Sequence, residues 1–400
     1  MNKQAKNIIT SLFGIMLEGK MDFESIGEKR GSLFFQKALA LDNIYAKETV
    51  RLYTNQIARE ADEVIGQLRE CSANIIQKAP LHGLWINGKK YIPVDIDTTT
   101  MDNSKTKKEG VSRTYQGFDG YHPIMAYIGK EGYMLDCELR PGSQHCQKGT
   151  VTFIEGIHKQ LKRIKTAGRI LFRMDGGNDC FETLKTATSE KTHYCIIKRN
   201  KRKENDEEWL KRAKRHGKRI ESRKGKKVWI GIINKHPGKK GEVLKDVRCA
   251  FEIIQRKIDS KGNRLLIPEI EVNSWWTNLN CEAEKIIELY HGHATSEQYH
   301  SELKTDMYAE RLPSGKFAVN KILLSVAMIA FNTLKLLGQK SVENENAMYK
   351  KRKRVGKVIR DLICVAGKLV KHGRQLIFKM NEKDPMLPIF LRLNAAFDYL

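Results

Sequence analysis

The pattern of apolar and polar positions divides the chain into helical and sheet-forming stretches. Residues 1 to about 88 favour helices, and the stretch 47–60 places Val50, Tyr53 and Ile57 at helical spacing, which Val64 continues. The other face of this helix is charged. A DNA-reading helix and a plain surface helix both fit, because amphipathic spacing alone does not distinguish them.

From Leu84 onwards the period changes from helical to alternating. Short apolar runs on either side of Asn87-Gly88 predict two strands joined by a tight turn. The runs that follow predict two adjacent strands, a helix and another strand, in the order 121–128, 132–140, 149–164 and 169–174. The spacing therefore predicts a sheet with at least one helix packed against it.

The interval from 180 to about 285 combines strand-like runs with dense positive charge. Its strand candidates are 228–233, 248–254 and 264–268. The span 196–229 holds fifteen Lys and Arg against five Asp and Glu, which favours contact with a phosphate backbone. A solvated loop is the alternative interpretation of such a charge run.

The last third of the chain is predicted to be helical. Residues 316–337 are strongly apolar, and their longest apolar run, 322–331, is too short to cross a bilayer, which favours a buried core helix. A second basic run, 350–354, precedes an amphipathic stretch over 355–376.

Composition and charge narrow the class of protein. The 400 residues carry a net charge of +25, from 72 Lys and Arg against 47 Asp and Glu, and 40% are hydrophobic. The chain can therefore form two or three domains with a large core, which excludes a disordered basic tail. A folded protein this basic favours nucleic acid as its partner, with salt-sensitive binding. A solubilising surface and an anionic membrane are the alternatives.

The cysteines and the N-terminus point to an intracellular protein. The sequence has 8 cysteines and no CxxC pair, which argues against a zinc site of the usual spacing and for reduced thiols in a cytosolic protein. The first residues show no signal-peptide pattern.

Three acidic residues suggest the chemistry. Asp97 ends the strand-like run 94–97, Asp175 ends the run 170–175, and Glu297 lies in a polar helical stretch. Acids at two strand ends and on a later helix can converge, and converging carboxylates suit Mg²⁺ or Mn²⁺. Two such ions can activate water or a hydroxyl to attack a phosphodiester.

Each acid also fits a purely structural role. An Asp after a strand is a common turn residue, and a Glu in a first helical turn is favoured by the helix dipole. Asp95 shares a strand face with Asp97, so the residues alone leave open which of the two is the first ligand.

Helical geometry adds weight to Glu297. At about 100° per residue, four residues fall on one narrow stripe: Tyr290, His293, Glu297 and Lys304. Such a stripe would line an edge that faces nucleic acid. Gly292 is expected to place Tyr290 and His293 before the helix proper, which leaves Glu297 and Lys304 on one face.

Four short motifs flank these acids: 94–99, 139–149, 173–177 and 290–304. In combination they resemble motifs of bacterial insertion-sequence transposases of the DDE class. The Leu-Arg-Pro-Gly segment at 139–142 resembles the insertion sequence 1380-type branch. The spacing from Tyr290 to Lys304 is that of the Tyr-Arg-Glu-Lys signature of the related insertion sequence 4-type enzymes, with His293 in place of Arg. The resemblance covers roughly residues 84–340.

The resemblance implies an α/β fold with a ribonuclease H-like core, a five-stranded mixed sheet with flanking helices. It also implies a largely β insertion between Asp175 and Glu297, which the long interval between them fits, and helical N- and C-terminal regions. The expected domains are a helical DNA-end-binding region (1–83), the first part of the catalytic core (84–179), a basic, largely β insertion (180–285), the C-terminal part of the core (286–340) and a basic helical region (341–400).

The resemblance further implies that Asp97, Asp175 and Glu297 bind two divalent ions, Mg²⁺ or Mn²⁺, and it favours Asp97 over Asp95. One ion would activate water to cut a transposon end, and the freed 3′-hydroxyl would attack target DNA. The implied partners are double-stranded DNA, as terminal inverted repeats and target, and further copies of the chain in a dimer or higher oligomer in the bacterial cytoplasm. His293 in place of Arg would make its DNA contact pH-dependent.

The candidate DNA-binding residues come from the stripe and the two basic runs: Tyr290, His293, Lys304, Lys198, Arg199, Lys201, Arg202, Lys203, Lys351, Arg352, Lys353 and Arg354. Trp275-Trp276 could stack on a flipped base, although a buried strand pair is favoured. A nuclease or resolvase without strand transfer, and a non-enzymatic nucleic-acid-binding protein, are the alternative functions. The three acids argue against the last.

Overall fold

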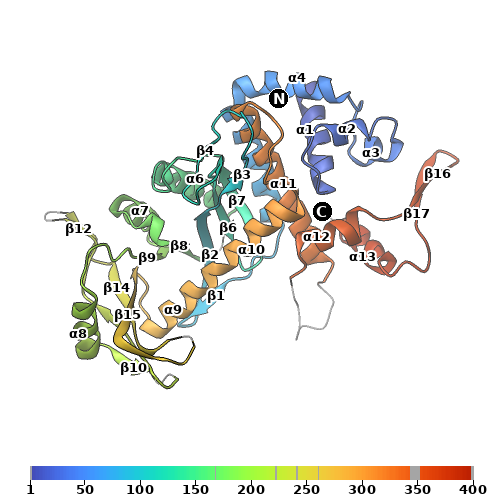
Figure 1. Ribbon diagram of the computed structural model, residues 1–400. Coiled ribbons are helices and arrows are strands. Elements are labelled where there is room, and N and C mark those ends of the chain that lie inside the picture. Colours follow the sequence, from blue (N-terminus) through green and yellow to red (C-terminus); the bar gives the residue numbers. More distant parts are fainter. Residues whose placement is uncertain are drawn as a thin grey trace.

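The computed structural model describes residues 2–166, 168–220, 223–239, 242–259, 261–342 and 352–397. One long sheet runs through the molecule, from a helical bundle at one end to a β-rich lobe at the other (Figure 1). The predicted mixed α/β class is confirmed.

The centre of the sheet is β2 (Lys89–Thr98). On one side it pairs antiparallel with β6 (Ile124–Ile128), which pairs antiparallel with β7 (Tyr133–Glu138). On the other side β8 (Arg169–Met174) and β9 (His193–Lys198) continue in parallel. β2 is buried from Tyr91 to Ile96, and burial becomes partial at Asp97.

The predicted tight turn joins β1 (Leu84–Ile86) to β2. Asn87 has φ 48° and Gly88 has φ 71°. Two consecutive positive φ angles match the hairpin turn whose twist suits the flanking strands. The Asn-Gly pair thus sets the register in which Ile86 faces Lys89.

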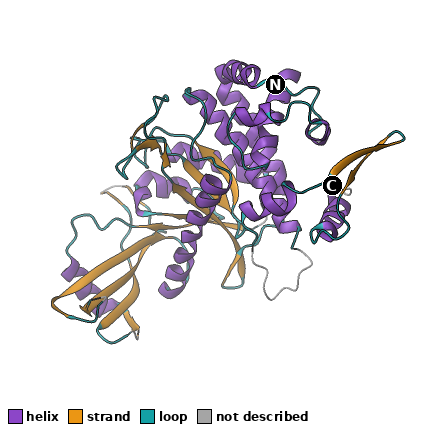
Figure 2. Ribbon diagram, turned by 45° about the vertical axis from the view of Figure 1, so that its right-hand side comes forward, coloured by secondary structure: helices purple, strands orange, loops and turns teal. Residues whose placement is uncertain are grey.

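Helices cover both faces of the central sheet (Figure 2). On one face α6 (Thr150–Arg163) packs Ile154 and Ile157 into a cluster with Phe172 of β8. α7 (Phe181–Ala187) contributes to the same cluster through Leu184. On the other face, α11 (Phe317–Lys340) packs against Tyr127 and Met134. The alternation of the strand residues between two apolar clusters explains why β6 and β7 read as nearly continuous apolar runs.

The N-terminal bundle packs around α11. Its helices are α1 (Lys3–Leu17), α2 (Glu24–Gly27), α3 (Leu33–Ala38), α4 (Lys47–Ile57) and α5 (Ala61–Gln77). The apolar stripe of α4 faces this bundle, because Val50 is fully buried and Tyr53 and Ile57 pack against the same cluster. α11 is long and apolar enough to cross a membrane by composition, but 78% of its apolar window is buried inside the fold, as predicted for a core helix.

A small sheet follows β2 and stands beside its C-terminal end. It consists of β3 (Met101–Asp102), β5 (Asp119–Tyr121) and β4 (Ser112–Arg113), in that order. Tyr121 forms a bridge to Pro141, so the Leu-Arg-Pro-Gly segment packs on this sheet.

The basic interval forms a β-rich lobe that extends the central sheet. It contains α8 (Asp206–His216), β10 (Lys218–Ile220), β11 (Lys226–Ile233), β12 (Gly238–Lys239), β13 (Glu242–Val243), β14 (Arg248–Ile258) and β15 (Arg264–Thr277). β15 pairs with β9 only over Trp275–Thr277. Residues 181–198, placed in the insertion from sequence, form α7 and β9 and belong to the central sheet and its covering layer. The predicted strands are confirmed, and Trp275 and Trp276 are a buried pair.

The C-terminal region departs from the prediction of a helical segment. α12 (Val355–Val358) and a π-helical turn (Ile359–Ile363) come first, but Lys368–His372 and Gln375–Lys379 form a hairpin, β16 and β17, before α13 (Leu387–Phe397). Gly367 and Gly373 interrupt the helical pattern, and Gly373, with φ 60°, closes the hairpin turn. The expected helix over 355–376 is therefore wrong in its second half.

Candidate active site

The register of the central sheet brings two of the three acids together. β2 and β8 run parallel with Ile96 paired to Met174, so the next residue of each strand, Asp97 and Asp175, emerges at the same edge of the sheet. The alternation of strand side chains puts Asp95 and Asp97 on one face, as predicted.

A single cavity of about 1380 Å³ lies over this edge. All three acids line it: Asp97, Asp175 and Glu297. Tyr290, His293 and Lys304 of the predicted stripe line it as well. The spacing of Tyr290, His293, Glu297 and Lys304 therefore identifies the face of the segment 290–304 that lines the cavity.

That segment is nearly continuous helix. α9 (Ala283–His291) passes through a 3₁₀ turn (Gly292–Ala294) into α10 (Thr295–Ser301) and a π-helical turn (Glu302–Asp306). A Cβ on Gly292 would lie 2.4 Å from Nη1 of Arg173. A larger residue here would have to displace the Arg173 guanidinium from the partners that hold it.

Asp95 is held in a buried ion cluster. Arg173 Nε and Nη2 donate to its two carboxylate oxygens, each at 2.7 Å, and His293 Nδ1 lies 2.9 Å from Oδ1. The Asp95 side chain is 2% exposed. Arg173 Nη1 also donates to the carbonyl of Leu289 at 2.7 Å, which ties β2 and β8 to α9. With its oxygens engaged in this way, Asp95 is a poor candidate for a metal ligand.

His293 belongs to the same cluster and is 6% exposed. Burial lowers the pKa of His293, but the hydrogen bond and charge of Asp95 outweigh it, so the pKa is raised. Its Nε2 has no hydrogen-bond partner among the described residues. The side chain thus supports Asp95 with one nitrogen and lines the cavity, which is a more buried position than a surface DNA contact would have.

Asp97 lies beside donors on α10 and at its own strand end. Thr98 N donates to Oδ1 at 2.8 Å, Ser296 Oγ donates to Oδ2 at 3.3 Å, and His300 Nε2 lies 3.5 Å from Oδ2. Burial raises the pKa of Asp97, but His300, His293 and the Thr98 N–H outweigh it, so the pKa is lowered. The carboxylate is therefore ionised and oriented toward the cavity.

Asp175 has the opposite balance. Burial and the charge of Asp97 raise its pKa, against the hydrogen bonds from Asn178 and Gly177. Asn178 Nδ2 donates to Oδ1 at 2.8 Å. A Cβ on Gly177 would lie 3.2 Å from both Asp175 oxygens and 2.9 Å from Cys146 Sγ. The glycine turn therefore leaves room for the Asp175 carboxylate. Asp175 is both a turn residue and a residue of the site.

Asp97 and Asp175 are neighbouring carboxylates that repel each other. A divalent cation bound between such carboxylates would relieve this repulsion. Glu297 is exposed on α10 and faces the same cavity. Among the described residues, no three His, Cys, Asp or Glu side chains are close enough together to hold an ion. Asp97 and Asp175 thus fit the implied metal, and Glu297 lines the same cavity without closing a ligand set with them.

The other predicted DNA-binding residues divide into free and engaged side chains. Lys304 Nζ donates to the Thr100 carbonyl at 2.7 Å. Arg199 is 9% exposed, pairs with Glu204 and stacks over Trp209 and Trp276. Lys201 pairs with Asp206. Lys198 is half-buried with its Cγ next to Gly176.

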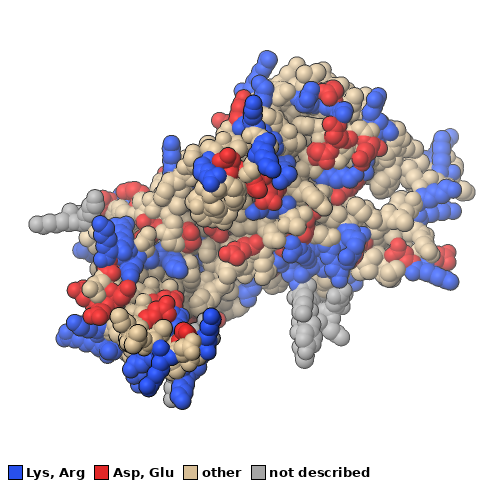
Figure 3. Space-filling model, viewed as in Figure 1, with Lys and Arg blue, Asp and Glu red and all other residues tan. Residues whose placement is uncertain are grey.

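Arg202 and Lys203 differ from their neighbours because both are exposed. They line a second cavity, of about 980 Å³, between α7 and the β-rich lobe. Figure 3 shows Lys and Arg side chains gathered over this lobe, among scattered acids.

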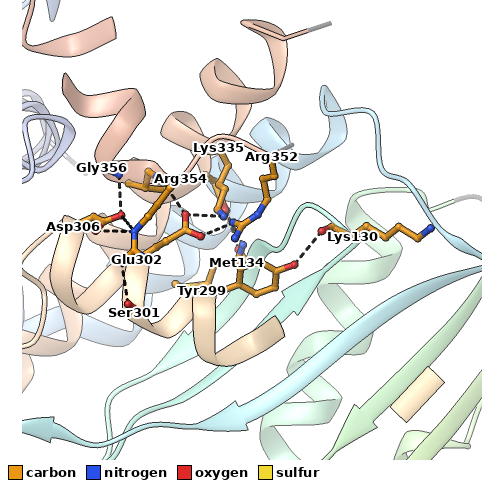
Figure 4. Close-up of polar contacts among 12 residues, drawn as sticks. Lys130, Met134, Tyr299, Ser301, Glu302, Asp306, Lys335, Arg352, Arg354 and Gly356 are labelled. Carbon is orange, nitrogen blue, oxygen red and sulfur yellow. Dashed lines mark hydrogen bonds and ion pairs between the residues drawn. The ribbon is translucent and has the colours of Figure 1, made fainter. Parts of the chain in front are cut away.

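The C-terminal basic run packs against the segment that carries Glu297 (Figure 4). Arg352 Nη1 lies 2.6 Å from Glu302 Oε1, and its guanidinium lies over the ring of Tyr299 at 4.7 Å. Arg354 Nε donates to Asp306 at 2.8 Å. Lys353 lies beside Gly338 of α11. Lys351 lies outside the described residues.

Glu302 is the centre of this cluster. It is 1% exposed and also accepts from Lys335 Nζ of α11 and from Val355 N, both at 3.0 Å. Burial raises the pKa of Glu302 against the pull of Arg352. Arg352 and Arg354 thus hold the π-helical turn that follows α10.

Sequence reasoning missed several side chains that surround the acids. They are Tyr115, His122, Cys146, Ser296 and His300. His300 lies three residues after Glu297, at a spacing that helical geometry could have identified. Its Nδ1 lies 3.0 Å from the Tyr127 hydroxyl, which fixes the ring beside Asp97.

The Leu-Arg-Pro-Gly segment leads into the loop that forms a wall of the cavity. Arg140 is 1% exposed and donates to Glu138 at 2.7 Å and to the Cys146 carbonyl at 3.1 Å. A Cβ on Gly142 would lie 2.2 Å from the Ser112 carbonyl. The motif therefore folds the loop 142–146, which lines the cavity beside Asp175.

Comparison with known proteins identifies the family of the chain. The family model for the transposase DDE domain, group 1, matches residues 35–400. The chain belongs to this family and is a DDE-type transposase. No curated protein shows detectable similarity to it. Among solved structures, the chain is similar to the piggyBac transposase in a synaptic complex with hairpin DNA, with 10% identity, a TM-score of 0.45, and coverage of 89% of this chain and 70% of that one.

Proposed function

We propose that this transposase cuts DNA at transposon ends with divalent metal ions and joins the freed 3′-hydroxyl to target DNA. The observation that carries the proposal is the common cavity of Asp97, Asp175 and Glu297, in a chain of the DDE family. The strand order β7-β6-β2-β8-β9, with two antiparallel and two parallel pairings, supports a ribonuclease H-like core.

Asp97 and Asp175 would hold the metal, and Glu297 would complete the ligand set when DNA fills the cavity. Bound Mg²⁺ or Mn²⁺ supplies Lewis-acid activation of water or a 3′-hydroxyl toward the scissile phosphodiester. The chain's own side chains prepare this reaction. His300 and Ser296 orient Asp97, and the Asp95 cluster fixes the strand ends against α9. Tyr290 and Lys304 flank the path of the DNA backbone.

The assignment of the acids is tested by conservative variants. Asp97→Asn, Asp175→Asn and Glu297→Gln should each abolish metal-dependent strand cleavage and leave duplex binding largely intact. Cleavage is measured on a labelled duplex that carries an end sequence of the element, and binding on the same duplex in chelator. Full cleavage by any one variant would falsify its role.

A nuclease without strand transfer remains the second candidate, since the same acids would serve it. A joining assay with precut end DNA separates the two: joined product supports the transposase, and hydrolysis without joining supports the nuclease.

Further parts of the proposal follow from the sequence motifs. We place the chain in the bacterial insertion sequence 1380-type branch, acting in the bacterial cytoplasm as a dimer or higher oligomer on paired ends. The N-terminal bundle would recognise the terminal repeats, and the β-rich lobe, through Arg202 and Lys203, would contact the backbone beside the cavity. Two ions per site is the expected stoichiometry.

A further inference from the structure

We propose that the β16–β17 hairpin is a DNA-binding ribbon, a role that no sequence motif assigns to it. The hairpin projects from the body of the molecule beside the C-terminal helices in both ribbon views (Figures 1 and 2). An isolated two-stranded hairpin is marginally stable in water. This hairpin contacts the body of the molecule through one face, so its other face is open to a partner.

The charge of the hairpin is entirely positive. Residues 368–379 contain Lys368, Lys371, Arg374 and Lys379, together with His372, and no Asp or Glu. All five are exposed. None forms an ion pair with another described residue, in contrast to Arg352 and Arg354 of the preceding basic run.

The register places like charges opposite each other. Lys368 pairs directly with Lys379 across the two strands. Like charges in this position destabilise a sheet, and nothing within the described chain neutralises them. A phosphate backbone supplies the counter-charge, and the release of its counterions drives binding.

The two faces of the ribbon differ in their surroundings. On one face Phe378 packs on Phe34 of α3, with ring centroids 5.1 Å apart. On the other, strand alternation aligns Lys368 and Lys379 with Val370, Ile377 and His372. Arg374 stands in the turn at the tip. One face is thus anchored to the N-terminal bundle and the other presents cations outward, at dimensions that a DNA groove admits.

The ribbon would give the chain a contact for DNA away from the cavity, and this role rests on the proposed function as a transposase. It is tested on the full-length chain in chelator with a fluorescein-labelled duplex of mixed sequence, so no cleavage is required. The variant carries Lys368→Gln, Arg374→Gln and Lys379→Gln. The control carries Lys89→Gln, Lys130→Gln and Lys159→Gln, three exposed lysines of the central sheet and α6 without ion pairs to other described residues.

Removing three phosphate contacts should reduce the slope of log affinity against log salt by roughly 2.7, at about 0.9 per contact. The control, with the same loss of charge, should change it by less than about 1. Equal losses in both variants would show that only net charge matters and would overturn the inference.

A further variant with two substitutions controls for misfolding of the hairpin. Lys368→Arg with Lys379→Arg keeps both charges and should keep the slope. Loss of phosphatidylserine-vesicle binding in the full-length glutamine variant, with an unchanged DNA slope, would assign the ribbon to a membrane and refute the proposal. Cleavage measured separately reports on the proposed function, so failure of one leaves the other standing.

Discussion

At the scale of single residues, the two acids on one face of β2 have different roles. Both oxygens of Asp95 are paired with Arg173 or His293. Asp97 is oriented by longer contacts, such as that from Ser296, and lines the cavity. Fully paired oxygens make a carboxylate structural, and partly free oxygens leave it able to bind a ligand. The alternation of strand residues placed Asp95 and Asp97 on one face, but it did not show which of them is structural and which can bind a ligand.

Asp95→Asn should destabilise the fold strongly. It leaves the Arg173 guanidinium without its charged partner inside the protein, which costs about 3–5 kcal/mol. Asp97→Asn should cost less, because Asn keeps the shape and relieves repulsion with Asp175. Urea unfolding of the two variants beside wild type measures the difference. Equal free energies of unfolding would contradict the assignment.

His293 should make stability depend on pH. Its folded-state pKa is raised chiefly by Asp95 against the effect of burial, and Arg173, Asp97 and Tyr290 also surround it. The stabilisation is therefore complete below the ordinary pKa of about 6.5 and is lost as pH rises through the higher folded value.

The check is the free energy of unfolding of wild type and His293→Gln at about pH 6 and about pH 9. The difference between them should be larger at the lower pH. A difference that does not change with pH would show that the imidazole charge contributes nothing.

At the scale of elements, the position of α10 depends on a segment distant in sequence. Glu302, the first residue after α10, lies between Lys335 of α11 and Arg352 and pairs with both (Figure 4). Glu297 lies on the same helix and has no closed ligand set with the other acids. The C-terminal segment thus packs directly after the helix that carries the third acid.

Arg352→Ala should weaken this pairing and lower both stability and the cleavage rate. The loss of a charge-assisted contact to a buried carboxylate costs about 1–3 kcal/mol. The salt slope of duplex binding should stay as in wild type, and Arg352→Lys should restore part of the rate. A slope reduced by about 0.9 with unchanged stability would instead identify Arg352 as a phosphate contact.

At the scale of the whole molecule, the cavity lies where the central sheet, the α9–α10 segment and the loop 142–146 meet. Its acids, Asp97, Asp175 and Glu297, come from parts of the chain that are 78 and 122 residues apart. A cation that binds them links these parts, so it should stabilise the entire fold and not only the site.

Mg²⁺ or Mn²⁺ should therefore raise the melting temperature of wild type, by an amount equivalent to about 2.7 kcal/mol at a hundredfold excess over Kd. Chelator should reverse the rise. Asp175→Asn should melt no lower than metal-free wild type, because the raised pKa of Asp175 marks a charge that the fold tolerates poorly. The same variant should lose the metal response, and a full response would exclude Asp175 as a ligand.

The sequence predicted local structure well wherever the period was clear. The Asn87-Gly88 hairpin, β8 and the strands of the β-rich lobe appear as expected, because turn chemistry and alternation are local properties. The C-terminal hairpin was missed because its apolar residues also fit a helical pattern until Gly367 and Gly373 are given weight. Of the site, the sequence identified the three acids and the stripe from Tyr290 to Lys304, which share one cavity.

The sequence by itself determined the family, the basic character and which residues stand at strand ends and on one helical face, since these depend on spacing along the chain. Only the tertiary structure decided which charged side chains are paired with other side chains of the protein. Asp95, Arg199 and Arg352 are engaged with partners, while Asp97 and Arg202 remain open. The reason is physical: a charge is free or neutralised according to what folding brings next to it, and those neighbours lie far away in sequence.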